Sequence, residues 1–207
     1  MIFMIKIYQK LLSNFGKQNW WPSITRTKFE IVVGAILTQN TSWENVDKVI
    51  KLMNEKRLLN RDAIRKIPLG RLAKIIKSSG YYNQKARKLK EFAKYNGGVE
   101  RGSMLKIWGI GRETADSILL YAYNKPYFVV DAYTKRIFSR LGLIETDDYE
   151  DIREFFEKSL PRDLKVYKEF HALIVKLAKK YCKKKPLCKE CPLLKICKYN
   201  KRIRRNY

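Results

Sequence analysis

A pair of glycines, Gly109 and Gly111, lies between two apolar helical patterns and constrains the fold of this chain more than any other feature. A short apolar stretch precedes the pair, and residues at helical spacing follow it: Leu105, Ile107 and Trp108, then Thr114, Ala115, Ile118, Leu119 and Ala122. This pattern predicts a helix-hairpin-helix. Glycine allows positive φ and brings no side chain, so the backbone amides of Gly109, Ile110 and Gly111 can approach a phosphate. We expect the hairpin to hold a nucleic-acid backbone without reading bases.

An acidic residue, Asp131, follows the hairpin helix after a loop that contains Pro126 and the run Tyr127–Val130. That run is too short and too isolated to predict a sheet. Asp131 opens a further helical pattern that ends at Gly142. A lone aspartate before a helix is most often an N-cap, and here it is also a carboxylate held at a fixed distance from the hairpin. Both interpretations stay open at this point.

The chain carries a large excess of positive charge, with 45 Lys and Arg against 20 Asp and Glu and a formal net charge of +25. Nucleic acid is the commonest polyanionic partner of such a protein, although a lysine-rich proteome would also raise the charge. No apolar run approaches the length of a membrane span, and the N-terminal residues lack the apolar core and cleavage site of a signal peptide. We therefore expect an intracellular, cytoplasmic protein that works at the chromosome and not at a membrane.

Helical patterns cover most of the chain, few runs have the period of a strand, and no repeat is present, so we predict an all-α fold. The run Phe29–Leu37 is apolar almost all round and predicts a central buried helix. It ends in the polar cluster Thr38–Thr41, which places Gln39 and Asn40 at an exposed mouth. The remaining predicted helices cover residues 1–16, 43–52, 62–67, 69–76, 81–95 and 166–181.

The four cysteines lie close together near the C-terminal end with the spacing C-x5-C-x2-C-x5-C: Cys182, Cys188, Cys191 and Cys197. In a reducing compartment such a cluster predicts metal ligands more than disulfides. Tetrathiolate zinc usually uses two CxxC pairs, whereas one CxxC with two longer arms could span a larger four-iron cluster. The spacing therefore favours a [4Fe-4S] cluster, with zinc as the alternative. Because lysines crowd this loop, we expect the cluster chiefly to shape a basic surface for DNA phosphate.

Two adjacent indoles, Trp20 and Trp21, precede Pro22 in a predicted loop. Large aromatic side chains in a loop either anchor the loop to the protein or form the wall of a pocket. The sequence by itself favours anchoring.

The motifs IWGIGRETA and VVD, joined by a proline loop and followed by the cysteine cluster, resemble the helix-hairpin-helix (HhH-GPD) superfamily of DNA base-excision glycosylases that includes endonuclease III. The resemblance covers nearly the whole chain. It implies two helical lobes: a six-helix barrel over 25–130 that holds the hairpin, and a second lobe of 1–24 plus 131–207 with an iron–sulfur loop at 182–197. It also implies double-stranded DNA with a damaged base as the substrate, and we expect a monomer. Endonuclease III relatives have the spacing C-x6-C-x2-C-x5-C, one residue longer in the first arm.

The resemblance implies that Asp131, which ends the VVD motif, is the catalytic residue. Hydrolysis of an N-glycosidic bond develops positive charge on the sugar, which a fixed carboxylate stabilises. Endonuclease III itself carries a lysine two residues after the second hairpin glycine, and this lysine gives it lyase activity. Glu113 occupies that position here and cannot form an imine, so we expect a monofunctional glycosylase unless another lysine substitutes.

A base within duplex DNA must be flipped out before an enzyme can reach it. By resemblance, Gln39 in ILTQNT fills the vacated space and Tyr81 in GYYNQKA enters the opposite strand. We expect Lys85 and Arg87 to face phosphate.

The motifs WWP, TQNTSW and GYYNQKA resemble the 3-methyladenine glycosylases of this superfamily more than endonuclease III itself. In those relatives the positions of Trp21 and Pro22 line the base pocket, and an aromatic residue at the position of Trp43 stacks on the base. Aromatic faces suit a positively charged methylated purine, although they also stack on neutral bases. An alkylated purine is our first expectation. Uracil or an oxidised base is the alternative, since an archaeal uracil glycosylase resembles the chain about as well, and a non-catalytic DNA-binding protein is the alternative of another class.

Overall fold

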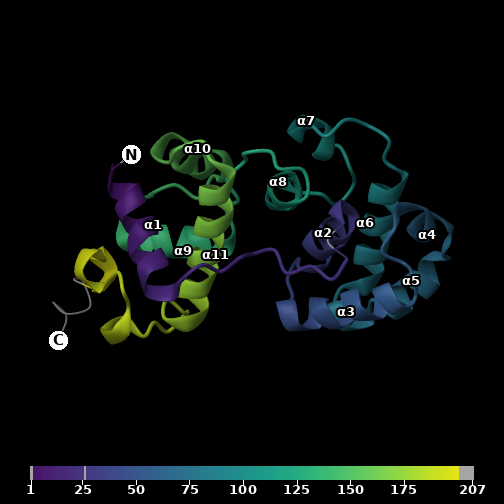
Figure 1. Cartoon of the computed structure of the whole chain (residues 1–207), viewed down its shortest axis with the longest axis horizontal. Helices are drawn as coiled ribbons and strands as arrows, with labels where there is room; N and C mark the ends of the chain where they lie inside the picture. Colours follow the sequence, from purple (N-terminus) through teal and green to yellow (C-terminus); the bar gives the residue numbers. More distant parts are fainter. Residues whose placement is uncertain (1, 26, 201–207) are drawn as a thin grey trace. The chain divides into compact units, whose positions relative to one another are not determined.

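The computed structural model describes residues 2–25 and 27–200, whose regular elements are all helices (Figure 1). No strand occurs among the residues so described, and the predicted all-α fold is confirmed. The chain divides into two compact units. We call Trp21–Lys125 the central unit, and Met1–Trp20 together with Pro126–Tyr207 the terminal unit. The division falls a few residues before each predicted lobe boundary.

The central unit contains the helix-hairpin-helix. Its helices are α2 Lys28–Leu37, α3 Trp43–Glu55, α4 Arg61–Lys66, α5 Leu69–Ile75, η1 Lys77–Ser79, α6 Tyr82–Lys94, α7 Arg101–Met104 and α8 Arg112–Tyr121. Helix α2 packs against α3, α6 and α8, and it is buried over most of its length, as its apolar sequence predicts. Helix α6 packs in addition against α4 and α5. The second helix of the hairpin, α8, is therefore supported directly by the core of this unit.

The terminal unit joins the two ends of the chain. Its helices are α1 Ile2–Phe15, α9 Ala132–Leu141, α10 Tyr149–Ser159 and α11 Leu164–Lys180, followed by the short turns η2 Cys188–Glu190 and η3 Leu194–Ile196. Helix α11 packs against α1 and α9 (Figure 1). The core is aromatic, and the rings of Phe128 and Phe156 stack with centroids 4.3 Å apart. Phe128 and the two valines after it are buried, which fixes the segment that leads into α9.

Helix boundaries in both units follow the residues that stop helices. Gly16 follows α1 and Gly142 follows α9, with φ of +69° and +73°, a conformation that favours glycine. Pro68 separates α4 from α5, as predicted. None of the helices in the described ranges is both long and apolar enough to cross a membrane.

Candidate functional site

The structure favours glycine at the two hairpin positions for different reasons. Gly109 has a φ of +79°, and a Cβ atom there would lie 2.6 Å from the side chain of Lys88. Gly111 has a φ of −84°, which any residue adopts, and a Cβ atom there would meet open space. Gly111 is the N-cap of α8, and as a glycine it supplies no side-chain cap to that helix end. The missing side chain at Gly111 therefore leaves the N-terminus of α8 accessible, where the helix dipole favours an anion such as phosphate.

Ile110 anchors the hairpin, and its predicted role in phosphate binding is wrong. Its side chain is buried, and its amide donates a hydrogen bond to the carbonyl oxygen of Ile107 at 3.1 Å. A backbone amide has a single hydrogen, so this amide is already used within the turn. The apolar pattern predicts the hairpin correctly but does not reveal the hydrogen bonds inside it.

A buried ion pair ties the two helices of the hairpin together. The guanidinium of Arg101 in α7 donates from Nε to Oδ1 of Asp116 in α8 at 2.7 Å, and from its NH2 group to Oδ2 at 3.1 Å. Asp116 is fully buried and the Arg101 side chain is 16% exposed. This two-pronged geometry is the strong form of the interaction. Because α7 is a single turn, the pair fixes where the chain enters the hairpin.

Gln39 lies against the hairpin within the central unit. Its amide nitrogen donates to Oγ1 of Thr114 at 2.8 Å and to the carbonyl oxygen of Gly109 at 3.5 Å. The Lys88 ammonium donates to Oε1 of Gln39, so both ends of this amide have partners. Gln39 is half-buried and Asn40 is exposed, which agrees with the predicted mouth after α2. The insertion of Gln39 into DNA stays a prediction.

Lys85 is buried, with 1% of its surface exposed, and the prediction that it faces phosphate is wrong. Its ammonium donates to the carbonyl oxygen of Leu37 at the end of α2, at 2.8 Å, and to that of Ser79 at 2.5 Å. Burial, with a smaller contribution from Lys88, lowers the pKa of Lys85 to about 8. Lys85 therefore joins α2, η1 and α6 inside the unit, a role that a local basic pattern does not reveal.

The surface of α6 and of the hairpin carries the two other residues that we predicted to contact DNA. Tyr81 is 66% exposed and has a left-handed backbone conformation with φ of +45°. Arg87 is exposed, and its guanidinium lies 4.0 Å from the ring centroid of Trp108, which is also exposed. This stacking orients the guanidinium at the surface beside the hairpin. The structure therefore leaves Tyr81 and Arg87 accessible to a partner.

The predicted base-pocket residues Trp21 and Trp43 lie together in the central unit. Their rings meet edge to face with centroids 5.2 Å apart, and the centroid of the Tyr121 ring lies 5.1 Å from that of Trp21. A Cβ atom on Gly34 would lie 2.9 Å from the Trp21 ring, so this glycine allows the indole to sit directly on α2. Tyr121 is a member of this aromatic group that the sequence did not single out. Trp21 thus anchors its loop, while Trp21 and Trp43 both stay half-exposed and Pro22 is exposed.

Glu30 holds the loop that carries Trp21 and Pro22. It is 2% exposed, and its carboxylate accepts hydrogen bonds from the backbone amide of Ile24 at 2.6 Å and from the amide and hydroxyl of Thr25, each at 2.5 Å. Burial acts to raise the pKa of Glu30, but these hydrogen bonds outweigh it and lower the pKa. A buried carboxylate in α2 therefore fixes the loop.

Asp131 is both the N-cap of α9 and a buried carboxylate. Its Oδ1 accepts hydrogen bonds from the amide of Thr134 at 2.7 Å and from the hydroxyl of Thr134 at 2.8 Å. Its Oδ2 lies 3.6 Å from Nε2 of His171 in α11. Burial acts to raise the pKa of Asp131, but the contacts with His171 and Thr134 outweigh it, so the pKa is lowered. The site therefore holds an ionised carboxylate in a largely water-excluded position.

His171 and Trp20 complete the surroundings of Asp131, and our sequence analysis missed this role for both. His171 is 5% exposed, and its ring stacks on the indole of Trp20 with centroids 5.4 Å apart and an interplanar angle of 26°. His171 is the single histidine of the chain, and this rarity was the signal available in the sequence. The contact with Asp131 joins residues that are far apart in the chain, so spacing could not have found it.

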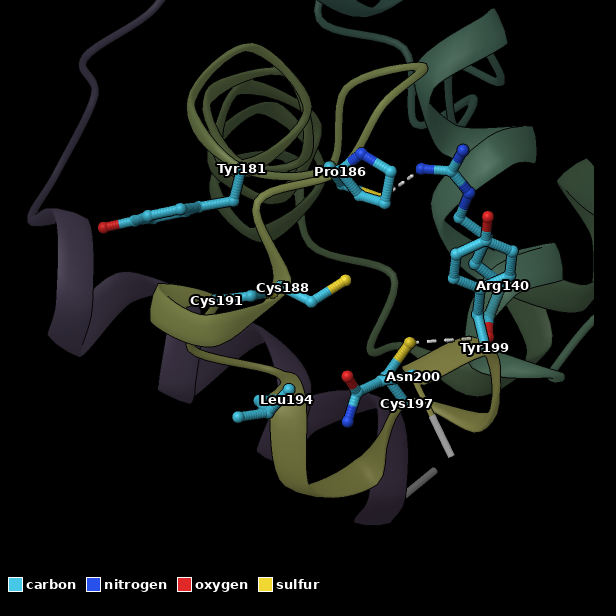
Figure 2. A pocket seen from close by; sticks show the side chains of 10 residues that line it. Arg140, Tyr181, Pro186, Cys188, Cys191, Leu194, Cys197, Tyr199 and Asn200 are labelled. Atoms are coloured by element: carbon cyan, nitrogen blue, oxygen red, sulfur yellow. Dashed lines mark hydrogen bonds between the residues drawn. The ribbon is translucent and has the colours of Figure 1, made fainter. Parts of the chain in front are cut away.

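The four cysteines line one pocket in the terminal unit, together with residues that include Arg140 and Tyr199 (Figure 2). The sulfur atoms of Cys188 and Cys197 point into it (Figure 2). The Arg140 guanidinium lies 3.3 Å from Sγ of Cys182, and Sγ of Cys197 lies 3.5 Å from the Arg140 carbonyl oxygen. Across residues 2–25 and 27–200, no three His, Cys, Asp or Glu side chains are grouped closely enough to hold one metal ion.

Burial also affects the acidity of these thiols. It raises the pKa of Cys188, and it raises the pKa of Cys191 to about 11. At both positions burial therefore favours the thiol over the thiolate. A metal or metal cluster supplies the positive charge that holds cysteine as thiolate.

Comparison with known proteins agrees with this geometry. Residues 33–162 match the HhH-GPD superfamily of base excision DNA repair proteins. The protein MJ1434 of Methanocaldococcus jannaschii, named as a candidate DNA repair glycosylase, is 50% identical over 199 residues, which cover 88% of this chain and 90% of that protein. Among solved structures, a non-covalent endonuclease III–DNA complex superposes with a TM-score of 0.85 at 26% identity and covers 98% of this chain and 97% of that one.

A second solved structure is the Helicobacter pylori 3-methyladenine DNA glycosylase MagIII, bound to 1,N6-ethenoadenine. It superposes with a TM-score of 0.75 at 32% identity and covers 86% of this chain and 96% of that one. The family match spans more than half of the chain and contains the hairpin, Gln39, Tyr81 and Asp131. The chain therefore belongs to the HhH-GPD superfamily of base excision DNA repair proteins and is an endonuclease III-like DNA glycosylase.

Proposed function

We propose that this glycosylase removes its target base by hydrolysis, with Asp131 as the catalytic carboxylate. The observation that carries the proposal is a carboxylate that is 9% exposed and nevertheless has a lowered pKa. As the bond between C1′ and the base nitrogen breaks, its electron pair leaves with the base and positive charge develops on the sugar. A fixed negative charge stabilises that state, and the oxygen of a water then adds to C1′ and loses its proton.

The protein leaves an abasic site intact, because Glu113 stands where endonuclease III has its lyase lysine. Glu113 is exposed in the first turn of α8. A carboxylate cannot form the imine that β-elimination requires, whereas a lysine amine can. Borohydride reduction would trap an imine as a covalent protein–DNA adduct, so trapping by another lysine is the result that would contradict this part of the proposal.

The central unit supplies the contacts with DNA. The amides at Gly109 and Gly111 hold a backbone phosphate, and Arg87 contacts a further phosphate. Gln39 and Tyr81 enter the duplex from which the base has been flipped. The exposure of Tyr81 and the open N-terminus of α8 support these roles.

The target base in this proposal is an alkylated purine such as 3-methyladenine. The half-exposed rings of Trp21 and Trp43, beside Pro22, offer aromatic faces to a positively charged base, which the ring quadrupole attracts. The likeness to MagIII, whose solved structure holds an ethenoadenine, supports the same substrate class. Aromatic rings also stack on neutral bases, so uracil or an oxidised base is the second candidate.

Asp131 also separates this proposal from a non-catalytic DNA-binding role. A protein that only binds DNA would need the hairpin and the basic surface. It would have no use for a buried ionised carboxylate that is 9% exposed. The enzyme is therefore favoured over the binding protein.

The cysteine pocket holds a [4Fe-4S] cluster in this proposal, with zinc as the alternative. Cys182, Cys188, Cys191 and Cys197 would be its ligands, since all four line the same pocket. The cluster would shape the basic loop around it for contact with DNA phosphate. Iron and sulfide analysis and the absorption spectrum of anaerobically purified protein test this assignment, and stoichiometric zinc without iron would overturn it.

The decisive experiment uses a panel of duplexes that each contain one lesion: 3-methyladenine, 7-methylguanine, uracil, 8-oxoguanine or a thymine mismatch. Strand cleavage after alkali reports abasic sites, and cleavage without alkali reports lyase activity. We expect alkali-dependent cleavage of the alkylated duplexes and no adduct with borohydride. If only uracil or only 8-oxoguanine were excised, that base would replace the alkylated purine as the proposed substrate. Binding without excision of any lesion would favour the non-catalytic alternative.

A further inference from the structure

The two oxygens of the Asp131 carboxylate have different surroundings. Oδ1 is fully engaged by the amide and hydroxyl of Thr134, which belong to the same helix start. Oδ2 faces the imidazole of His171, which comes from a different helix. The N-cap interaction alone would fix one oxygen and would still allow the carboxylate plane to rotate about it. The imidazole therefore determines where the second oxygen lies.

His171 is itself held rigidly. It lies in the middle of α11, where it is 5% exposed, and the indole of Trp20 covers one face of its ring. Stacking on a large aromatic ring restricts rotation of the imidazole and keeps water from that face. The edge that carries Nε2 is the part that meets Asp131. A side chain locked in this way can position a neighbouring catalytic group.

We infer that His171, clamped by Trp20, is a positioning residue for glycosidic hydrolysis: its Nε2 edge fixes Oδ2 of Asp131 so that the carboxylate meets the developing charge on the sugar. This inference rests on the proposed function, since it assigns a role to a neighbour of the catalytic group. It predicts that loss of Nε2 slows the chemical step and leaves DNA binding intact, because His171 lies beside the carboxylate and not in the hairpin.

Two substitutions at this position separate positioning from packing. His171→Phe keeps a flat ring against Trp20 and removes both ring nitrogens, whereas His171→Gln removes the ring but can place an amide nitrogen near the position of Nε2. We expect His171→Phe to lower the single-turnover excision rate by about 10²-fold, the scale of a misplaced catalytic group. His171→Gln should recover most of that loss. The DNA dissociation constant of both should stay within about twofold of wild type, which separates binding from chemistry.

Val175→Ala is the matched control for stability. Val175 is a buried residue of the same helix and lies one turn from His171. Its truncation should lower the melting temperature, as a core substitution does, without changing the excision rate of the folded protein. If His171 only packed the core, His171→Phe would behave like Val175→Ala.

A second measurement needs no DNA substrate. Since the chain has one histidine, selective labelling of histidine in untagged protein gives one set of imidazole NMR signals. We expect Asp131→Asn to move these signals at fixed pH, and Glu145→Gln, which removes an exposed carboxylate of the same unit, to leave them unchanged.

The combined outcomes distinguish the two proposals. Full excision by His171→Phe, together with an inactive Asp131→Asn, would overturn the positioning role and leave the glycosylase mechanism standing. Normal excision by Asp131→Asn would overturn the mechanism and with it the positioning role. Imidazole signals that do not respond to Asp131→Asn would overturn the contact itself, even if the lesion tested were the wrong substrate.

Discussion

Helix α8 of the central unit and helix α9 of the terminal unit begin in opposite ways. Helix α8 begins at Gly111 with no side-chain cap, whereas α9 begins at Asp131, whose carboxylate caps it through Thr134. Both helix ends have the partial positive charge that favours an anion. At α9 the anion belongs to the protein, and at α8 the end is open to an anion from outside. The comparison shows that one structural device, the start of a helix, is satisfied by a carboxylate of the protein in one unit and is left without a side-chain cap from its N-cap residue in the other.

The largest expected effect follows from removing the charge at the start of α9. Asp131→Asn keeps an N-cap of similar quality but has no negative charge, so we expect excision to fall by about 10³-fold with little loss of stability. Single-turnover excision and thermal melting measure the two effects. Asp131→Ala is the companion variant, and it should in addition lose about 1 kcal/mol because the cap is gone. An Asn variant with normal turnover would contradict the catalytic assignment.

The next largest effect should follow from removing the ion pair that joins α8 to α7. Arg101→Met removes the guanidinium that pairs with the buried Asp116, and we expect the free energy of unfolding to fall by on the order of 3 kcal/mol. Denaturant unfolding measures this loss. The double variant Arg101→Met with Asp116→Leu removes both charges and should recover much of the stability. If the double variant were no more stable than Arg101→Met, the buried charge would not be the cause.

A smaller effect should follow from placing a capping side chain at the N-terminus of α8. Gly111→Asp supplies both a cap and a negative charge, so we expect DNA binding to weaken by about tenfold while stability stays equal or rises slightly. Fluorescence anisotropy with duplex DNA and thermal melting report the two quantities. Gly70→Asp is the matched control, because Gly70 is also exposed and a Cβ atom there also meets open space. Equal weakening in both variants would show that only the net charge matters.

At the C-terminal end of a helix the partial charge is negative, and there the protein supplies a cation: the Lys85 ammonium bonds to the carbonyl oxygen of Leu37 at the end of α2. The effect expected from Lys85 is a dependence of stability on pH. Burial lowers the folded-state pKa of Lys85 to about 8, and an unfolded lysine titrates near about 10.4. Between these values the unfolded chain binds more protons than the folded chain, so the free energy of unfolding rises with pH. We expect wild type to gain on the order of 2 kcal/mol relative to Lys85→Met across this window. If the free energy of unfolding changed with pH in the same way for both proteins, the pKa of Lys85 would not be lowered in the folded state.

Local sequence signals predicted much of the fold and part of the site. The turn-forming Gly16, Pro68 and Gly142 gave helix boundaries close to those observed, because these residues act on their own backbone. The cysteine spacing indicated thiols that the structure brings to one pocket. Asp131 was expected either as an N-cap or as a site carboxylate, and the structure shows that it caps α9 and is also buried.

The residues that sequence analysis missed or misplaced depend on contacts between distant segments. Lys85 looked like a surface cation in a basic helix, yet its ammonium bonds to Leu37 on a different helix. His171 meets Asp131, and Tyr121 meets Trp21, across long stretches of chain. Periodicity describes one helix at a time, so it carries no information about which side chains of two helices meet.

The left-handed backbone of Tyr81 has a consequence for the stability of the fold. A non-glycine residue with φ of +45° costs about 1 kcal/mol, and an aromatic ring that is 66% exposed gains little from burial in return. Glycine at this position would relax the backbone, so folding alone would favour it. With tyrosine there, the protein has a large exposed ring at a backbone position where glycine would be less strained.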